Sequence, residues 1–343
     1  MTAPPVSLAF AGVGWIAAVH GYAVEQLPGV QITTVASRDP KRAAESALRL
    51  GATVCSYEDL PNGADGVVVC TPPARHAEDA LRAVAAGAGA LVEKPLCTTL
   101  QQADDLVAAA DAGACIAYAE NLVHAPVVRR ALEHSAQLGV IDVLEVRAIQ
   151  GRPTWGDFLT EAWGGGVLFD LGVHPLAIAL LLAAPAQPVE VRASLEGAPD
   201  HPVDEHAEVH VAFDSGLVAR IVASWRGGET PTWDAQASSP DGVVRFELLP
   251  EPLLERNGVE VPLPAPPTGV VPQLADLGYL AQIESFAADV KSGRTPGLGA
   301  SFGRSVLDVV CGAYASAGRN GAWIELPFTG PRDQSPLQLW RGQ

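Results

Sequence analysis

The chain has 343 residues, 48% of them hydrophobic, so two domains of ordinary size are expected and a disordered protein is not. Acidic side chains outnumber basic ones by 39 to 22, which gives a formal net charge of −17. Such a field repels nucleic acids and argues against an anionic membrane surface, so we expect neither as a partner. The five cysteines form no CxxC pair, and no basic residue precedes the first apolar stretch as it does in a secretory signal. We therefore expect a cytoplasmic protein with free thiols.

Up to residue 121, short apolar runs alternate with alanine-rich helical segments. Strands are expected at residues 6–11, 30–36, 66–70, 90–92 and 115–118, and helices at residues 17–27, 40–50, 77–86 and 100–110. This alternation predicts an α/β fold with a doubly wound parallel sheet of the Rossmann type. We expect residues 1–121 to form an NAD(P)-binding domain.

The first expected strand runs into a GxGxxA turn that opens a helix. Its glycines let the backbone approach a pyrophosphate, and the amide groups at the helix end hold the negative charge. The predicted cofactor contacts here are Gly12, Gly14, Trp15, Ile16 and Ala17.

The second expected strand ends in Ser37-Arg38, where a dinucleotide site usually has an acid for the ribose 2′-hydroxyl. A hydroxyl group and a guanidinium suit a 2′-phosphate, and Arg42 can add a second positive contact. Asp39 could be the acid in a shifted register, but Asp39-Pro40 is typical of a helix N-cap followed by proline. The sequence favours NADP, with NAD possible.

Two later strands end in polar residues at the edge of the sheet where ligands bind. Glu93 and Lys94 follow an apolar run and stop at a proline, and burial makes such a lysine a usable proton donor or acceptor. A proline-stiffened turn with Thr71, Pro72 and His76 follows the preceding strand and is expected to flank the nicotinamide.

The second half has a different pattern, and we expect residues 122–343 to form an α/β domain for substrate binding and oligomerisation. Residues 140–148, 207–213 and 217–225 read as strands, the last two joined by an Asp-Ser-Gly hairpin turn. Helices are expected at residues 126–137, 279–290 and 304–316. The pattern predicts a large, mainly antiparallel open sheet with helices on one face. Because an exposed sheet face normally finds a partner, we expect a homodimer or homotetramer.

The segment GGGVLFDLGVHP, residues 164–175, reads as a buried helix that starts after three glycines. Within one helix, Asp170 and His174 are about one turn apart and point the same way. A lone histidine on an apolar helix is more often a core residue, and the aspartate beside it is what favours a functional site.

The chain resembles the glucose-fructose oxidoreductase/inositol dehydrogenase/rhizopine-catabolism (Gfo/Idh/MocA) family of NAD(P)-dependent sugar dehydrogenases. The resemblance runs through GVGWIA, TPPARH, VEKP, AENLVHAP, GGGVLFDLGVHP and YLAQIESFAADVKSG. It implies a Rossmann domain followed by an α/β domain whose open sheet makes dimer or tetramer contacts. It also implies that Lys94, Asp170 and His174 surround the reacting carbon. His174 is then the acid/base, Lys94 orients the substrate oxygen, and Asp170 tunes both.

The function expected from the residues and the resemblance is hydride transfer between a nicotinamide and a sugar, polyol or related small molecule, with no metal. A glycosidase or epimerase that recycles NAD, and a non-catalytic cofactor sensor, are the alternatives. A metal site at His206, Glu208 and His210 is less favoured than a polar sheet face. Trp155 and Trp163 are either a platform for a sugar ring or part of the core.

Overall fold

The computed structural model describes residues 4–154 and 156–342. The chain divides into two compact units: unit 1 is Met1–Cys97, Gln101–Asn121 and Pro267–Arg304, and unit 2 is Thr98–Leu100, Leu122–Pro266 and Ser305–Gln343. This division differs from the predicted domains in one main respect, because residues 267–304 pack with the first unit and not with the second.

Unit 1 is built on a six-stranded parallel sheet with the order β3-β2-β1-β4-β5-β6. Its strands are β1 (Val6–Ala11), β2 (Val30–Ala36), β3 (Thr53–Cys55), β4 (Gly66–Val69), β5 (Gly89–Glu93) and β6 (Ile116–Ala119). Its helices are α1 (Trp15–Glu25), α2 (Pro40–Leu50), α3 (Pro73–Ala85), α4 (Leu100–Asp111), α8 (Pro272–Asp276) and α9 (Tyr279–Ser292), with Leu100 of α4 assigned to unit 2. The predicted doubly wound sheet is confirmed, and the short edge strand β3 was not expected.

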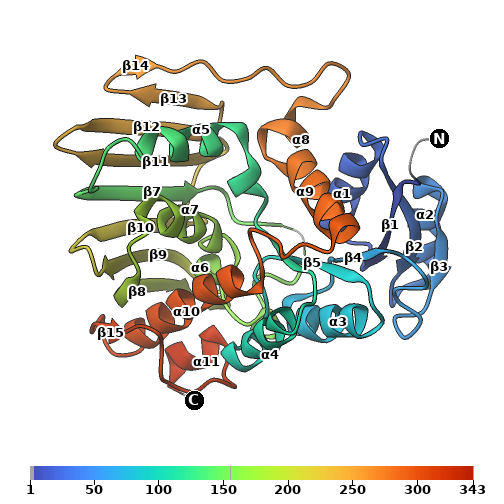
Figure 1. Cartoon of the computed structure of the whole chain (residues 1–343). Helices are drawn as coiled ribbons and strands as arrows, with labels where there is room; N and C mark the ends of the chain where they lie inside the picture. The colour runs from blue at the N-terminus through green and yellow to red at the C-terminus, as the bar shows by residue number, and fades with distance from the viewer. Residues whose placement is uncertain (1–3, 155, 343) are drawn as a thin grey trace. The chain divides into compact units, whose positions relative to one another are not determined.

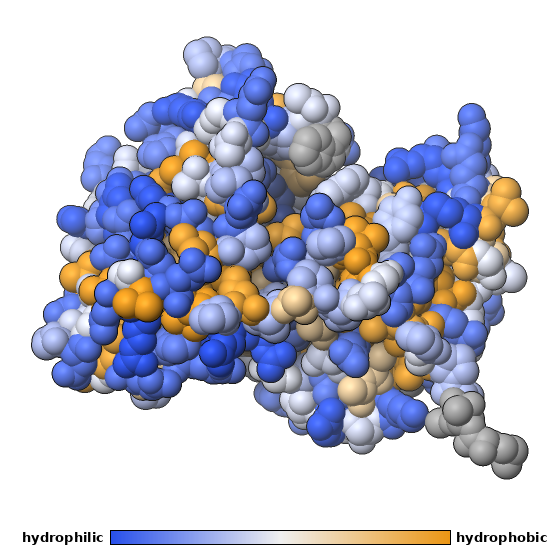
Figure 2. Space-filling view, turned by 90° about the horizontal axis from the view of Figure 1, so that it is seen from above, coloured by the Kyte–Doolittle hydropathy of each residue, from blue (hydrophilic) through white to orange (hydrophobic). Residues whose placement is uncertain are grey.

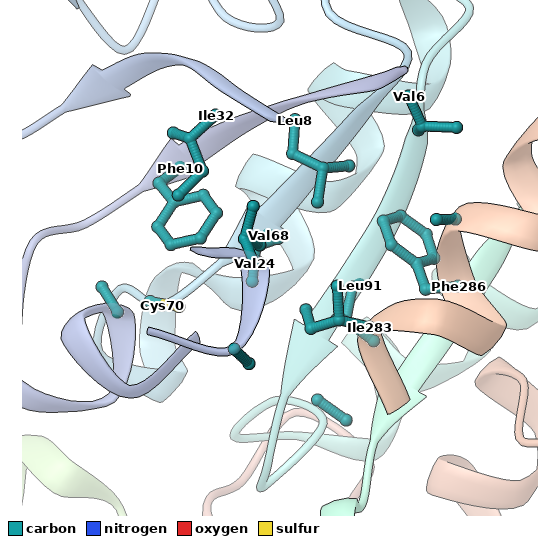
Figure 3. Packing of buried hydrophobic residues seen from close by; sticks show 14 of the residues in the cluster. Val6, Leu8, Phe10, Val24, Ile32, Val68, Cys70, Leu91, Ile283 and Phe286 are labelled. Carbon is teal, nitrogen blue, oxygen red and sulfur yellow. The ribbon is translucent and has the colours of Figure 1, made fainter. Parts of the chain in front are cut away.

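The core of unit 1 explains why α9, from late in the chain, belongs to it. Ile283 and Phe286 of α9 are fully buried and lie near Leu91 of β5 (Figure 3). A side chain at Gly89 would come within 2.6 Å of Val290, so the glycine at the start of β5 lets α9 lie close to the sheet. Burial of these apolar side chains, which is favourable by about 25 cal/mol per Å² of apolar surface, stabilises the attachment of α9.

Unit 2 contains a nine-stranded sheet with the order β14-β13-β12-β11-β7-β10-β9-β8-β15 (Figure 1). Its strands are β7 (Val143–Ile149), β8 (Pro188–Ala198), β9 (His201–Phe213), β10 (Val218–Ser224), β11 (Thr232–Ser239), β12 (Gly242–Leu249), β13 (Leu253–Arg256), β14 (Val259–Glu260) and β15 (Ile324–Glu325). Within the described residues β7 pairs with β10 in parallel and the other neighbours are antiparallel, so the predicted mainly antiparallel sheet is confirmed.

One face of the nine-stranded sheet is packed against helices. The helical segments of this part of the chain are η1 (Asn121–His124), α5 (Pro126–Ser135), η2 (Glu161–Trp163), α6 (Val167–Asp170), α7 (Val173–Ala183), α10 (Ala300–Ala317) and α11 (Pro336–Arg341). In Figure 1, α5, α7 and α6 lie over the sheet. Helix α7 contacts β7, in which Leu144, Val146 and Ala148 are buried. The alternate residues Glu145 and Arg147 point to the opposite face and stay partly exposed.

Candidate active site

The glycine turn after β1 has the geometry that a pyrophosphate site needs. Gly12 has a φ of +97°, and a side chain there would lie 2.6 Å from the carbonyl oxygen of Cys70, so only glycine fits. Gly14 is the N-cap of α1, and a Cβ at this position would meet no described atom within 4 Å. The space over Gly14 and the amide groups of the first turn of α1 therefore suit the phosphate groups of a dinucleotide.

The other predicted residues of this turn have different environments. Trp15 is 63% exposed at the start of α1, Ile16 is partly buried and Ala17 is 3% exposed. Ala17 therefore lets α1 pack closely on the sheet, which is the role of the third small residue in such turns.

The end of β2 carries the residues expected to select the cofactor. Both the Lys41 and Arg42 amides donate to Oδ1 of Asp39, at 3.0 and 3.2 Å, so the N-cap interpretation of Asp39 is confirmed. The Oγ of Ser37 accepts from the Asp39 amide, and Arg38 is exposed. The Arg42 guanidinium donates to the carbonyl oxygen of Val13 at 3.3 Å, which places its positive charge beside the glycine turn.

The turn after β4 is tied to the turn after β5 by a buried histidine. The ring of His76 has Nδ1 2.8 Å from the carbonyl oxygen of Pro95 and Nε2 2.7 Å from that of Thr71. Burial lowers the pKa of His76, against the opposing effect of these two carbonyl groups. A neutral imidazole donates to only one of them. From its buried position, His76 thus holds the two turns in place relative to one another. Pro72, by contrast, is exposed at the N-cap of α3.

Glu93 supports the backbone of Lys94. Its Oε2 accepts from the Lys94 amide at 3.0 Å, and its Oε1 lies 2.6 Å from Nε2 of His20, a fully buried residue of α1. Burial alone raises the pKa of Glu93, but the hydrogen bond with His20 and the charge of Lys94 outweigh it and lower the pKa. Glu93 is 5% exposed, whereas Lys94 is partly exposed. No local sequence signal marks His20, because its partner Glu93 is 73 residues away.

In unit 2, the prediction of a single helix after the three glycines of the segment 164–175 was wrong. The segment forms two helices, α6 and α7, separated at Leu171-Gly172. The stretch Glu161–Asp170, which ends with α6, makes an angle of 46° with α7. A side chain at Gly172 would lie 2.6 Å from the carbonyl oxygen of Leu168, so the glycine allows the close approach at the bend. Asp170 is therefore the last residue of α6 and His174 an early residue of α7, and they are 7% and 5% exposed.

The imidazole of His174 packs against an aromatic residue that the sequence analysis missed. Trp233 of β11 lies 5.6 Å from His174 between ring centroids, with the planes tilted by 35°. Apolar side chains of Leu122, Val146 and Ile178 line the small cavity around the pair. His174 therefore lies beside a small cavity that is lined mainly by apolar side chains, together with Arg147 and Asp234.

Residues 6–135 match the family model described as an oxidoreductase family with an NAD-binding Rossmann fold, and residues 128–238 match the GFO/IDH/MocA C-terminal domain. The chain belongs to the GFO/IDH/MocA oxidoreductase family. The predicted resemblance is confirmed, and unit 1 contains the NAD(P)-binding Rossmann fold of this oxidoreductase family.

Several family members resemble this chain over different lengths. An uncharacterized oxidoreductase from Rhizobium meliloti is 29% identical over a match that covers 57% of this chain and 61% of the relative. D-xylose 1-dehydrogenase (NADP(+)) 2 from Haloferax volcanii is also 29% identical, over 88% of this chain and 95% of the relative. The crystal structure of GenD2 from gentamicin A biosynthesis in complex with NAD is 25% identical, with a TM-score of 0.84 and coverage of 95% of this chain and 97% of that one.

The three predicted catalytic residues belong to different units of the chain. Lys94 is in unit 1, and Asp170 and His174 are in unit 2. That they surround one reacting carbon stays a prediction.

The remaining predicted residues have simpler surroundings. Trp163 packs against Phe158, with ring centroids 4.5 Å apart, and Trp155 lies outside the described residues. On the sheet face, the Glu208 carboxylate is held by the Arg220 guanidinium, at 2.8 and 3.1 Å. Burial and Arg192 lower the pKa of His210. No group of three His, Cys, Asp or Glu side chains in the described parts of the chain has the geometry of a metal site.

No single helix among the described residues is long and apolar enough to cross a membrane. The segments Glu161–Asp170 and Val173–Ala183 reach that length and composition only when counted together across their bend, and most of their residues are buried in unit 2.

Proposed function

We propose that this chain is an NADP(H)-preferring dehydrogenase or reductase that transfers a hydride between the nicotinamide and a hydroxyl or carbonyl carbon of a sugar or polyol. The observation that carries the cofactor preference is the end of β2, where Asp39 is engaged as the cap of α2 and Ser37-Arg38 occupy the position of the ribose-binding acid. The Haloferax volcanii relative is named for NADP(+), and the GenD2 structure is a complex with NAD, so the family accommodates both.

The residues of unit 1 fit a dinucleotide. The turn from Gly12 to Gly14 and the first amides of α1 hold the pyrophosphate, and Arg38 and Arg42 hold the 2′-phosphate. The ring of His76 joins the turn at Thr71-Pro72 to the turn that follows Glu93-Lys94. These two turns would flank the nicotinamide. When bound, the nicotinamide ring supplies or accepts the hydride.

The proton chemistry is assigned to His174, Lys94 and Asp170. His174 takes the proton from a substrate hydroxyl during oxidation and returns it during reduction. The ammonium group of Lys94 donates a hydrogen bond to the same oxygen and stabilises negative charge on it. Asp170 keeps the imidazole oriented. Glu93 holds the backbone of Lys94 and Trp233 packs on the His174 ring, so the backbone of the lysine and the ring of the histidine start from fixed positions.

Substrates are proposed to be carbohydrates or polyols because the relatives named for a substrate act on sugars. The test is a panel of sugars, inositols and aldehydes with each cofactor, followed by nicotinamide absorbance and product analysis. Turnover with net reduction or oxidation supports the proposal. A cofactor that stays bound while the sugar is epimerised or its glycosidic bond is cleaved indicates the recycling chemistry instead.

We also propose that the face of the nine-stranded sheet opposite the helices joins subunits in a homodimer or homotetramer. This face carries ion pairs between strands, among them Arg147–Asp234 and Arg220–Glu145. Paired charges are compatible with an interface, because each is already neutralised before a partner covers it. The visible surface in the space-filling view is largely hydrophilic with scattered hydrophobic residues (Figure 2). A monomer mass by light scattering at micromolar concentration would refute this proposal.

A further inference from the structure

The N-terminus of α6 is held by a carboxylate from a distant strand. Asp204 of β9 has no solvent exposure. Its Oδ1 accepts from the Gly166 amide at 3.0 Å and its Oδ2 from the Leu168 amide at 2.9 Å. Gly166 is the N-cap of α6 and has no side chain with which to cap the helix itself. Because a helix of four residues does not persist alone, this carboxylate determines where α6 begins.

Tyr314 of α10 completes the arrangement. Its hydroxyl group donates to Oδ1 of Asp204 at 2.5 Å and accepts from the Gly166 amide at 2.9 Å. Burial raises the pKa of Tyr314 well above its ordinary value, so the hydroxyl group stays a donor at neutral pH. Burial also raises the pKa of Asp204, although the bonds from Leu168 and Tyr314 act in the opposite direction. We call Asp204 and Tyr314 the α6 clamp.

The clamp accounts for the glycine run before α6. A side chain at Gly165 would come within 2.9 Å of the Tyr314 hydroxyl oxygen and 2.5 Å of Cβ of Phe169, and one at Gly166 would overlap the backbone of Asp204. Gly164 has a φ of +101°, which larger residues rarely adopt. The three glycines thus let the chain approach a buried carboxylate and hydroxyl group closely enough to bond them.

The path from the clamp to Asp170 is a single helical turn. The Asp170 amide donates to the carbonyl oxygen of Gly166 at 2.9 Å, so the residue that the clamp holds also holds the backbone of Asp170. The chain then bends at Gly172 and continues into α7, where the His174 amide donates to the carbonyl oxygen of Leu171 at 3.2 Å. A displacement of Gly166 therefore moves Asp170 relative to His174.

We propose that Asp204 and Tyr314 are positioning residues, which fix α6 and thereby the place of Asp170 beside His174 without touching the substrate. This inference rests on the proposed function, in which Asp170 and His174 act on the substrate oxygen. In Asp204→Asn the side chain keeps its shape, but one oxygen becomes an NH2 group that faces a backbone N–H and cannot accept from it. In Tyr314→Phe the ring stays and both hydroxyl bonds are lost.

The matched control is Ser316→Ala on the same helix. Ser316 is fully buried, accepts from the Ala193 amide at 3.0 Å and donates to the carbonyl oxygen of Ala322 at 2.6 Å. This variant loses two side-chain hydrogen bonds, one buried and one part-buried, and Tyr314→Phe also loses two; neither bond of Ser316 reaches α6. All three variants are expected to lower the Tm. Thermal stability alone therefore does not distinguish a role in positioning Asp170 from a purely structural role.

The experiment measures kcat, KM, the Kd of NADPH, and the pH titration of His174 by NMR, assigned through the signal lost in His174→Gln. A misplacement of about 1 Å costs on the order of 10²-fold in rate, so Asp204→Asn is expected to lower kcat by up to about that factor and Tyr314→Phe by less. In both, the His174 midpoint shifts and the Kd of NADPH stays constant, whereas Ser316→Ala keeps the wild-type kcat and midpoint.

The two proposals fail in different ways. If Tyr314→Phe and Ser316→Ala have the same kcat and the same His174 midpoint as the wild type, the clamp is only structural and the inference is overturned. If the wild type turns over no sugar with either cofactor, the proposed function fails, and the His174 titration of Tyr314→Phe still decides the inference. If Asp204→Asn does not fold, Tyr314→Phe decides alone.

Discussion

Arg38→Ala tests the cofactor preference, since only NADPH carries the 2′-phosphate that this guanidinium is proposed to bind. Hydrogen bonds to charged groups contribute about 1.5–3 kcal/mol, and the lower end applies because Arg38 is exposed. A loss of about 1.5 kcal/mol weakens binding by about tenfold. The Kd of NADPH is therefore expected to rise about tenfold, and the Kd of NADH to stay nearly constant.

The assay is a fluorescence titration of both cofactors at one fixed ionic strength. Arg49→Ala is the matched control: Arg49 lies in the last turn of α2 and pairs with Glu25 at 3.2 Å, so its loss removes the same charge far from the site. The control is expected to bind both cofactors as the wild type does. Equal losses of NADPH and NADH affinity in Arg38→Ala would refute the reasoning.

Three further predictions concern the two units. Gly14→Ala is expected to keep the Tm and weaken cofactor binding, whereas Gly12→Ala is expected to lower both the Tm and the cofactor affinity, because only a side chain at position 12 meets the Cys70 carbonyl group. Thermal melts and cofactor titrations check this, and a large loss of Tm in Gly14→Ala would contradict it. Because the pKa of Glu93 is lowered in the folded protein, its ionised form adds stability above the unfolded pKa of about 4.3, and this stability is lost as the pH falls through the folded pKa. Glu93→Gln should therefore make the free energy of unfolding depend less on pH in the acid range. An unchanged acid dependence would be inconsistent with this. Lys94→Ala and His174→Ala should each lower kcat on the order of 10²–10⁴-fold. The double variant should lose less than the product of the two single effects, because both residues serve one proton transfer. Near wild-type turnover in His174→Ala would mean that this histidine is a structural core residue.

Local signals in the sequence predict the Rossmann unit closely. The predicted bounds of β1, β2 and α2 agree with the structure, because apolar runs buried on both faces leave few alternatives and Asp39-Pro40 caps the helix. Strand β3 escaped detection, since three residues at the edge of a sheet carry no periodicity. The hairpin turn between β9 and β10 was predicted correctly from Asp214-Ser215-Gly216.

Features that depend on distant partners could not be predicted. The attachment of α9 to unit 1 follows from the packing of Ile283 and Phe286 against the first sheet, and no local pattern records it. The bend at Gly172 and the bonds from Asp204 to α6 also depend on tertiary contacts. The local sequence therefore predicted a single helix for this segment. The glycine run before α6 was the available signal, because three adjacent glycines suggest a close approach of the backbone to another group.

Within the candidate site, the sequence identified residues at strand ends but not the ones that hold them. Lys94 follows from its place after an apolar strand, whereas His20 becomes meaningful only when α1 brings it 2.6 Å from Glu93. Trp233 was missed because β11 reads as an ordinary polar strand, and its contact with His174 arises from the packing of α7 on the sheet.

Deuterium transfer tests the central claim most directly. The protein is incubated with NADP+ and sugars deuterated at their ring carbons, and the recovered cofactor is examined by mass spectrometry and NMR. Hydride transfer predicts reduced cofactor that carries one deuterium at C4 of the nicotinamide, in amounts equal to the oxidised product. An oxidised or rearranged sugar accompanied by cofactor without deuterium would contradict the account.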